Sequence, residues 1–103
     1  METNKIFDTS VALDKKEGTV TIFTFIEHTP SSKKRFDVEI PRYSDYQRAI
    51  RLAEQLRAKG TPVGAMDIII ASMCLNRSAM IVTKDKDFGI IKKVAPELKV
   101  RFV

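Results

Sequence analysis

The sequence contains one cysteine, one histidine and no tryptophan among its 103 residues. A lone cysteine, Cys74, excludes a disulfide framework and a zinc knuckle, and it suits a reducing compartment. The lone histidine, His28, has no second histidine or thiol beside it in the sequence pattern, so a structural or solvent-facing role is favoured over metal binding. Neither residue has the partners that a catalytic triad requires, and histidine- or thiol-based nucleophilic catalysis is therefore excluded.

Long hydrophobic runs are also missing. The longest uncharged apolar stretch, residues 68–75, is too short to span a bilayer. The amino-terminal segment METNKIFD has no apolar region typical of a secretion signal. Apolar residues make up 44% of the chain and charged residues 30%, as is usual for a soluble globular domain. We therefore expect residues 1–103 to form a single cytoplasmic domain.

Acidic residues are outnumbered by basic ones, with 13 Asp and Glu against 18 Lys and Arg, which gives a net charge of +5. This balance favours an anionic partner, and nucleic acid is the leading candidate. The run Lys33-Lys34-Arg35 is a weak candidate for phosphate contacts, because a charge run is usually only a solvated surface. Lys84 and Lys86 are better candidates for binding substrate phosphates, since they flank an acidic turn.

Strand-like and helix-like segments alternate along the chain. Runs rich in apolar, β-branched and aromatic residues predict strands at residues 5–7, 19–25, 36–40, 79–82 and 98–103. Helical spacing predicts helices at residues 10–16 (closed by Gly18), 44–59, 65–76 and 88–94. The alternation predicts an α/β fold with a mostly parallel sheet. In such sheets, functional residues gather beyond the carboxyl ends of the strands.

The clearest helix pattern lies between residues 44 and 59. Ser44 and Gln47 fit a capping box, and Gly60 ends the helix. Its apolar stripe is expected to face the core or to form a dimer surface, and consists of Tyr46, Ala49, Ile50, Leu52, Ala53 and Leu56. Four sulfur-containing side chains outside this helix are expected to fill the core, and they are Cys74, Met66, Met73 and Met80.

Four carboxylates stand next to apolar runs, where a charged group is normally unfavourable. Asp8 follows KIF, Glu27 follows TVTIFTFI, and Asp67 precedes IIIASMCL, while AMIVT ends two residues before Asp85. Strand ends that meet at one sheet edge would bring such acids together, and close carboxylates repel until a cation or raised pKa values relieve them. Any one of these acids alone is more often a cap or a surface charge. Their combination predicts a metal site.

Mg²⁺ and Mn²⁺ are the ions that this donor set favours, because both prefer oxygen ligands. They supply what phosphodiester hydrolysis needs, namely an activated water and a polarised phosphate. We expect Asp8 and Asp85 to bind the metal directly or through water, and Asp67 to hold the metal or its hydration shell. Glu27 is the candidate to orient or deprotonate the attacking water. The sequence leaves open whether one metal binds or two.

The motifs IFDTS (6–10), FIEH (25–28), GAMDIIIAS (64–72) and IVTKDKDF (81–88) resemble the signature of PIN-domain proteins, and especially VapC-type toxins of prokaryotic toxin–antitoxin pairs. The resemblance covers residues 5–103. It implies a PIN-like three-layer α/β/α fold with a mostly parallel central sheet. It also implies an Mg²⁺- or Mn²⁺-dependent ribonuclease, acting on RNA, that forms a homodimer and is neutralised by an antitoxin protein.

The same resemblance assigns roles to individual residues. It makes Asp8, Glu27, Asp67 and Asp85 the acidic quartet and Asp87 an auxiliary metal-binding acid, although Asp87 could instead cap the helix that follows it. It makes Ser10 and Thr83 polar neighbours of the metal or substrate, and for these two a capping role is equally open.

The chain departs from the toxin pattern between its first two acids. Only eighteen residues separate Asp8 from Glu27, whereas the family has a longer helical segment there that contributes to dimer contacts and antitoxin docking. The alternative is therefore a PIN-fold module that binds RNA or a protein with weak or no catalysis. A phosphatase of the haloacid-dehalogenase kind is disfavoured, because it would need Asp-x-Asp where this chain has Asp8-Thr9-Ser10.

Overall fold

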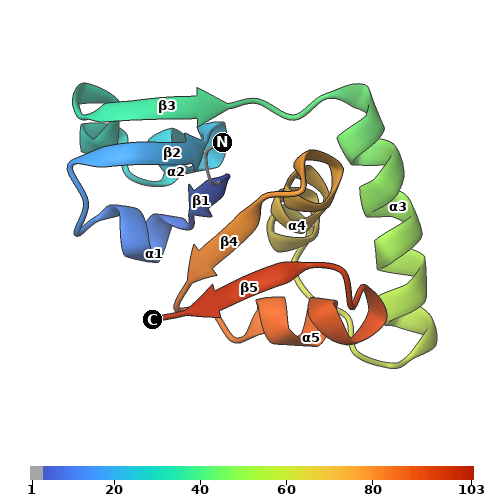
Figure 1. Cartoon of the computed structure of the whole chain (residues 1–103). Helices are drawn as coiled ribbons and strands as arrows, with labels where there is room; N and C mark the ends of the chain where they lie inside the picture. Colours follow the sequence, from blue (N-terminus) through green and yellow to red (C-terminus); the bar gives the residue numbers. More distant parts are fainter. Residues whose placement is uncertain (1–3) are drawn as a thin grey trace.

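The strands of the computed structural model, which describes residues 4–103, form two parallel ladders (Figure 1). The first ladder has the order β1-β4-β5, and the second pairs β2 with β3. β1 also lies beside β2, so the two ladders adjoin. The strand bounds are β1 Lys5–Phe7, β2 Glu17–Thr21, β3 Arg35–Glu39, β4 Met80–Thr83 and β5 Lys99–Phe102.

The helices fall into two groups. The shorter group lies near β1 and β2, and comprises α1 (Thr9–Ala12), α2 (Ile22–Glu27) and a 3₁₀ helix (Thr29–Lys33). The longer helices pack against one another, and are α3 (Tyr43–Ala58), α4 (Ala65–Arg77) and α5 (Asp87–Val94). Within residues 4–103, none of these helices combines the length and apolarity needed to cross a membrane.

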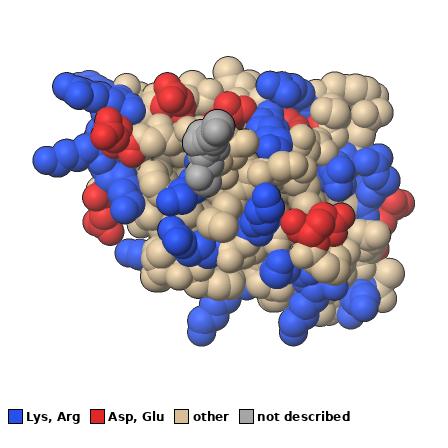
Figure 2. Space-filling view, in the orientation of Figure 1, with Lys and Arg blue, Asp and Glu red and all other residues tan. Residues whose placement is uncertain are grey.

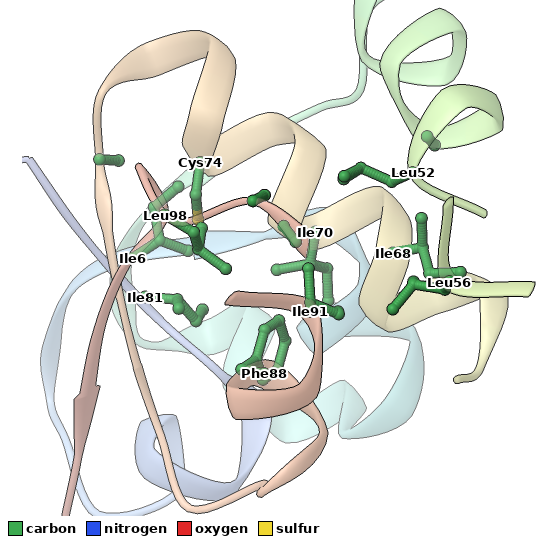
Figure 3. Close-up of a cluster of buried hydrophobic side chains, with 14 residues drawn as sticks. Ile6, Leu52, Leu56, Ile68, Ile70, Cys74, Ile81, Phe88, Ile91 and Leu98 are labelled. Atoms are coloured by element: carbon green, nitrogen blue, oxygen red, sulfur yellow. The ribbon is translucent and has the colours of Figure 1, made fainter. Parts of the chain in front are cut away.

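The alternation of side chains along β1 and β4 shows that the two groups of helices cover opposite faces of the sheet. Ile6 and Ile81 belong to the core cluster with residues of α3, α4 and α5 (Figure 3). Their neighbours Phe7 and Val82 point to the other face, where they line a groove together with Val11 of α1. The three-layer α/β/α arrangement with a parallel sheet is therefore confirmed.

The expected strand at residues 19–25 is wrong in its second half. The ladder between β2 and β3 ends at Thr21, and the chain continues as α2. Strand propensity of β-branched and aromatic residues is a weak preference that tertiary contacts override. In the helix that forms instead, Thr24 is 1% exposed and its hydroxyl lies 2.9 Å from the hydroxyl of Thr9. Glu27 consequently ends a helix rather than following a strand.

The first expected helix is shorter than its pattern indicated. It ends at Ala12, and Gly18, the expected terminator, lies inside β2. Gly18 has a φ of +138°, and a Cβ added there would lie 2.4 Å from Cε2 of Phe7. Glycine is thus required at this position by a close approach to the ring and by its backbone conformation.

The other expected helices and strands occur within one residue of their predicted ends, but two details of α3 differ. The helix begins at Tyr43, and the carboxylate of Asp45, not a Ser44–Gln47 capping box, accepts a hydrogen bond from the Arg42 backbone N–H at 2.7 Å. Ala49, Leu52 and Leu56 are buried as expected, whereas Tyr46 and Ile50 are 44% and 64% exposed.

A buried ion pair connects α3 to α4. Asp45 is fully buried, and both of its carboxylate oxygens accept hydrogen bonds from Arg77 at 3.0 Å. Arg77 also donates to Glu39 at 2.7 Å. The pair joins the start of α3 to the end of α4 on the side of α3 that buries Ala49, Leu52 and Leu56, and Tyr46 and Ile50 lie on the exposed side.

Candidate active site

Two neighbouring parallel strands place the first and last of the candidate acids. Asp8 follows β1 directly, and its backbone N–H donates to the carbonyl of Val82 in β4 at 2.9 Å. Asp85 lies two residues beyond the end of β4. Asp67 lies in the first turn of α4, and Glu27 is the last residue of α2.

The four acids of the predicted quartet all line one open cavity of about 300 Å³. The other lining residues are Thr9, Ser10, Met66, Ile70 and Lys84. Asp87 lies beside this cavity: one carboxylate oxygen each from Asp67, Asp85 and Asp87 lie within 4.8 Å of one another. Lys86 is exposed and does not line the cavity. Met66, predicted as core, is instead 37% exposed and forms part of the cavity wall.

Thr83 is a fully buried hydroxyl that connects two of the acids. Its Oγ1 donates to Oδ2 of Asp8 at 2.8 Å and accepts from the backbone N–H of Asp85 at 2.9 Å. The backbone N–H of Asp87 in turn donates to Oδ1 of Asp85 at 2.9 Å. These bonds hold the carboxylates of Asp8 and Asp85 in fixed orientations.

Glu27 is held by a threonine that the sequence pattern did not single out. Thr9 Oγ1 donates to Oε1 of Glu27 at 2.6 Å and also lies 2.9 Å from the hydroxyl of Thr24. The available signal was position, because Thr9 stands directly between Asp8 and Ser10 at the end of a strand. Thr24 could not be found in this way, since it was expected in a strand.

The electrostatics of the cavity disfavour a full set of ionised carboxylates. Burial raises the pKa of Asp67 from 3.8 to about 7, and the negative charges of Asp85, Asp8 and Asp87 contribute to the same shift. Burial also raises the pKa of Asp8, against the hydrogen bond from Thr83, which lowers it. A cation in the cavity would relieve this repulsion and favour the charged forms.

The lining residues fit a hard divalent cation. The polar side chains that face the cavity, apart from Lys84, offer only carboxylate and hydroxyl oxygens, and among the described residues no histidine or cysteine lines it. In addition, the buried Oγ of Ser10 has no hydrogen-bond partner within residues 4–103. Mg²⁺ and Mn²⁺ prefer oxygen ligands and keep part of their water shell, so a hydrated ion could also satisfy this hydroxyl.

Solved structures of bacterial VapBC complexes share this fold. VapBC-5 from Mycobacterium tuberculosis matches with a TM-score of 0.79 and 17% identity, covering 99% of this chain and 100% of that chain. DNA-bound VapBC from Salmonella typhimurium matches with a TM-score of 0.74 and 16% identity, covering 98% of each chain. VapBC2 from Rickettsia felis, bound to a DNA fragment of its promoter, matches with a TM-score of 0.72 and 15% identity, covering 95% of this chain and 97% of that chain.

Sequence comparison adds no further relative: neither a family model nor a curated protein matches the chain. At identities below 20%, the structural similarity establishes the fold. The chain thus has the PIN-like α/β fold found in VapBC toxin–antitoxin structures.

Proposed function

We propose that this chain is a metal-dependent endoribonuclease of PIN/VapC type, which hydrolyses RNA phosphodiesters through its acidic cluster. The observation that carries the proposal is the convergence of Asp8, Glu27, Asp67 and Asp85 in one cavity, although they come from β1, α2, α4 and the turn after β4. Strongly perturbed pKa values cluster at functional sites, and the pKa values of Asp8 and Asp67 are both raised. The PIN-like fold supports the same proposal.

Four acids are proposed to bind Mg²⁺ or Mn²⁺: Asp8, Asp67, Asp85 and Asp87. When bound, the ion lowers the pKa of a coordinated water and polarises the phosphate. Glu27, held by Thr9 at 2.6 Å, accepts the proton of the attacking water. Thr83 keeps Asp8 aligned through its 2.8 Å hydrogen bond.

Substrate contacts are assigned to Ser10, Lys84 and Lys86, whereas Thr83, also predicted to bind substrate, is fully buried and does not line the cavity. Ser10 and Lys84 line the cavity, so the hydroxyl can donate to a phosphate oxygen and the ammonium can pair with its charge. Thr83 contributes indirectly, because its hydroxyl donates a hydrogen bond to Asp8 and orients that carboxylate. Lys86 is exposed outside the cavity, where it can meet only a phosphate that flanks the scissile one.

The similar structures support a proposal about an antitoxin partner. These are VapBC complexes by name, and we propose an antitoxin protein as the inhibitory partner, a homodimer as the assembly and the cytoplasm as the location. Mass measurement of the protein alone and after co-expression with its neighbouring gene product tests both assembly proposals. A monomer that binds no such product would contradict them without affecting the proposed chemistry.

The test of the chemistry combines metal binding with RNA cleavage. We expect the wild type to bind Mn²⁺ in calorimetry and to cleave RNA with Mn²⁺ but not with EDTA. Asp8→Asn and Asp85→Asn should keep the fold and abolish cleavage, because each removes a metal-binding charge. Asp37→Asn, in exposed strand β3, is the matched control and should retain activity.

Three outcomes are informative. Full activity in both site variants would refute the acidic-site mechanism. RNA that is bound but uncut under every condition would favour the alternative binding module. Loss of Mn²⁺ binding together with cleavage in the site variants, with both kept in Asp37→Asn, would support the proposal.

A further inference from the structure

On one face of the ladder β1-β4-β5, the charged side chains of the three strands are all basic. Phe7, Val82 and Arg101 are paired in register across the three strands, so they lie on the same face. Lys5 precedes Phe7 by two residues and Lys84 follows Val82 by two, and the two-residue repeat places them on this face as well. This is the face opposite to the Ile6 and Ile81 core.

A groove of about 360 Å³ runs over this face, and its charge is strongly one-sided. Among residues 4–103, Lys5, Lys15, Lys84 and Arg101 line it, and Asp14 is the sole acidic lining residue. All four basic residues are exposed. In Figure 1 no helix crosses in front of β4 and β5, and Figure 2 shows Lys and Arg side chains over and around this part of the molecule.

The groove adjoins the acidic cavity at Lys84, which lines both. We propose that this basic groove binds the backbone of a single-stranded RNA whose scissile phosphate lies in the acidic cavity. The inference rests on the proposed function and gives its substrate a path. Residues two apart on a strand are ~7 Å apart, comparable with the distance between successive phosphates of an extended strand. Lys84 follows Val82 by two residues, and Arg101 lies opposite Val82 on β5, so the two cations are diagonal neighbours that can meet neighbouring phosphates of one RNA strand.

The groove is built to read phosphates and not bases. Its one aromatic ring, Phe7, has the Lys15 ammonium 5.4 Å from its centroid and the backbone of Gly18 against its edge. A base would have to displace Lys15 to stack there. Val11 and Val82, the buried apolar residues of the floor, offer no hydrogen bonds. Contacts to the backbone alone carry no sequence information, so binding along the groove is independent of sequence.

The experiment measures how RNA binding depends on salt, in EDTA so that no cleavage occurs. Fluorescence anisotropy with a labelled single-stranded RNA pool compares the wild type with Lys5→Gln/Arg101→Gln. The matched control is Arg57→Gln/Lys59→Gln, which removes two exposed charges at the far end of α3. Each lost phosphate contact should reduce the slope of log K against log salt by about 0.7. We expect a reduction of about 1.4 in the groove variant and none in the control.

A third variant, Asp14→Asn, should raise the affinity of the protein for RNA. Asp14 lies 3.5 Å from the Lys84 ammonium, and both side chains are exposed. Asp14→Asn removes the competing anion and frees Lys84 for a phosphate. It should bind RNA more tightly than the wild type at low salt and with a steeper slope. Unchanged or weaker binding would contradict the groove.

The remaining outcomes distinguish backbone binding in the groove from base recognition and from a protein ligand. Equal salt slopes for the groove and control variants would overturn the inference. A strong preference between polyuridine and polycytidine would show that the groove recognises bases, and it would overturn binding through the RNA backbone alone. Displacement of the RNA by polyglutamate at equal charge would indicate that the groove binds an acidic protein instead. If groove-dependent binding is found but the wild type never cuts RNA with Mn²⁺, the proposed function fails and the groove stands. If RNA is cut but the groove variant binds normally, the groove fails alone.

Discussion

Asp67→Asn should stabilise the metal-free protein, although it alters a residue of the proposed active site. Asp67 is half-buried in the first turn of α4, and its carboxylate lies near those of Asp85 and Asp87. Asparagine has nearly the same shape and no charge. The substitution therefore removes electrostatic repulsion without opening a cavity.

The magnitude follows from the pKa of Asp67, which rises from 3.8 to about 7 on folding. The folded protein holds this proton more tightly than the unfolded chain, so the wild type loses stability as the pH rises from 3.8 to about 7, and the loss is complete above that. At about 1.36 kcal/mol for each pH unit, the cost would approach ~4 kcal/mol. Because the side chain is half-exposed, solvent screening reduces this to about 1–2 kcal/mol.

The assay is urea unfolding in EDTA between about pH 4 and pH 8, which brackets the shifted pKa of Asp67. The stability difference between Asp67→Asn and the wild type should be near zero at about pH 4 and grow to about 1–2 kcal/mol at about pH 8. Asp37→Asn, exposed on β3, should show no such trend. Added Mg²⁺ should narrow the difference, because it stabilises only a protein that binds it. A difference that does not change with pH would refute the reasoning.

Three further substitutions test the structure that supports the site. Arg77→Met leaves the fully buried Asp45 without its ion-pair partner and should lower the free energy of unfolding in urea by about 3–5 kcal/mol. If the double variant Arg77→Met/Asp45→Asn recovers this stability, a simple packing defect is excluded as the cause. Thr83→Val removes two hydrogen bonds within the site and should weaken Mn²⁺ binding roughly 10–100-fold in calorimetry; unchanged affinity would show that the hydroxyl does not orient the acids. Gly18→Ala forces a Cβ into Phe7 and should lower stability by about 1–3 kcal/mol, and a neutral result would contradict the observed close contact.

The positions of Asp8 and Asp85 could be predicted from the sequence because they depend on a local rule. Each follows a short apolar strand, and parallel strands end at the same edge of the sheet. Asp67 was predictable for a related reason, since an acid in the first turn of a helix marks its start. These inferences need only the period of the side chains and the direction of the strands.

The position of Glu27 could not be derived in this way. Residues 22–27 have the composition of a strand, yet they form a helix in which Thr24 is buried and its hydroxyl lies 2.9 Å from that of Thr9. That contact joins residues fifteen positions apart, and no local window of the sequence contains the information. The exposure of Tyr46 and Ile50 was missed as well, because it depends on how α3 packs against α4, and contacts such as the Asp45–Arg77 pair join residues far apart in the sequence.

The segment from Ile81 to Asp85 shows how one alternating run serves the core, the groove and the site together. Ile81 is in the core cluster and Val82 in the floor of the groove. Thr83 lies on the core side and fixes Asp8, Lys84 returns to the groove, and Asp85 enters the cavity. Since the side-chain period is two, a shift of one residue would exchange these faces. The basic groove and the acidic cavity are therefore set by the same strand register, so a substrate guided by Lys84 arrives beside Asp85 without any further element to align it.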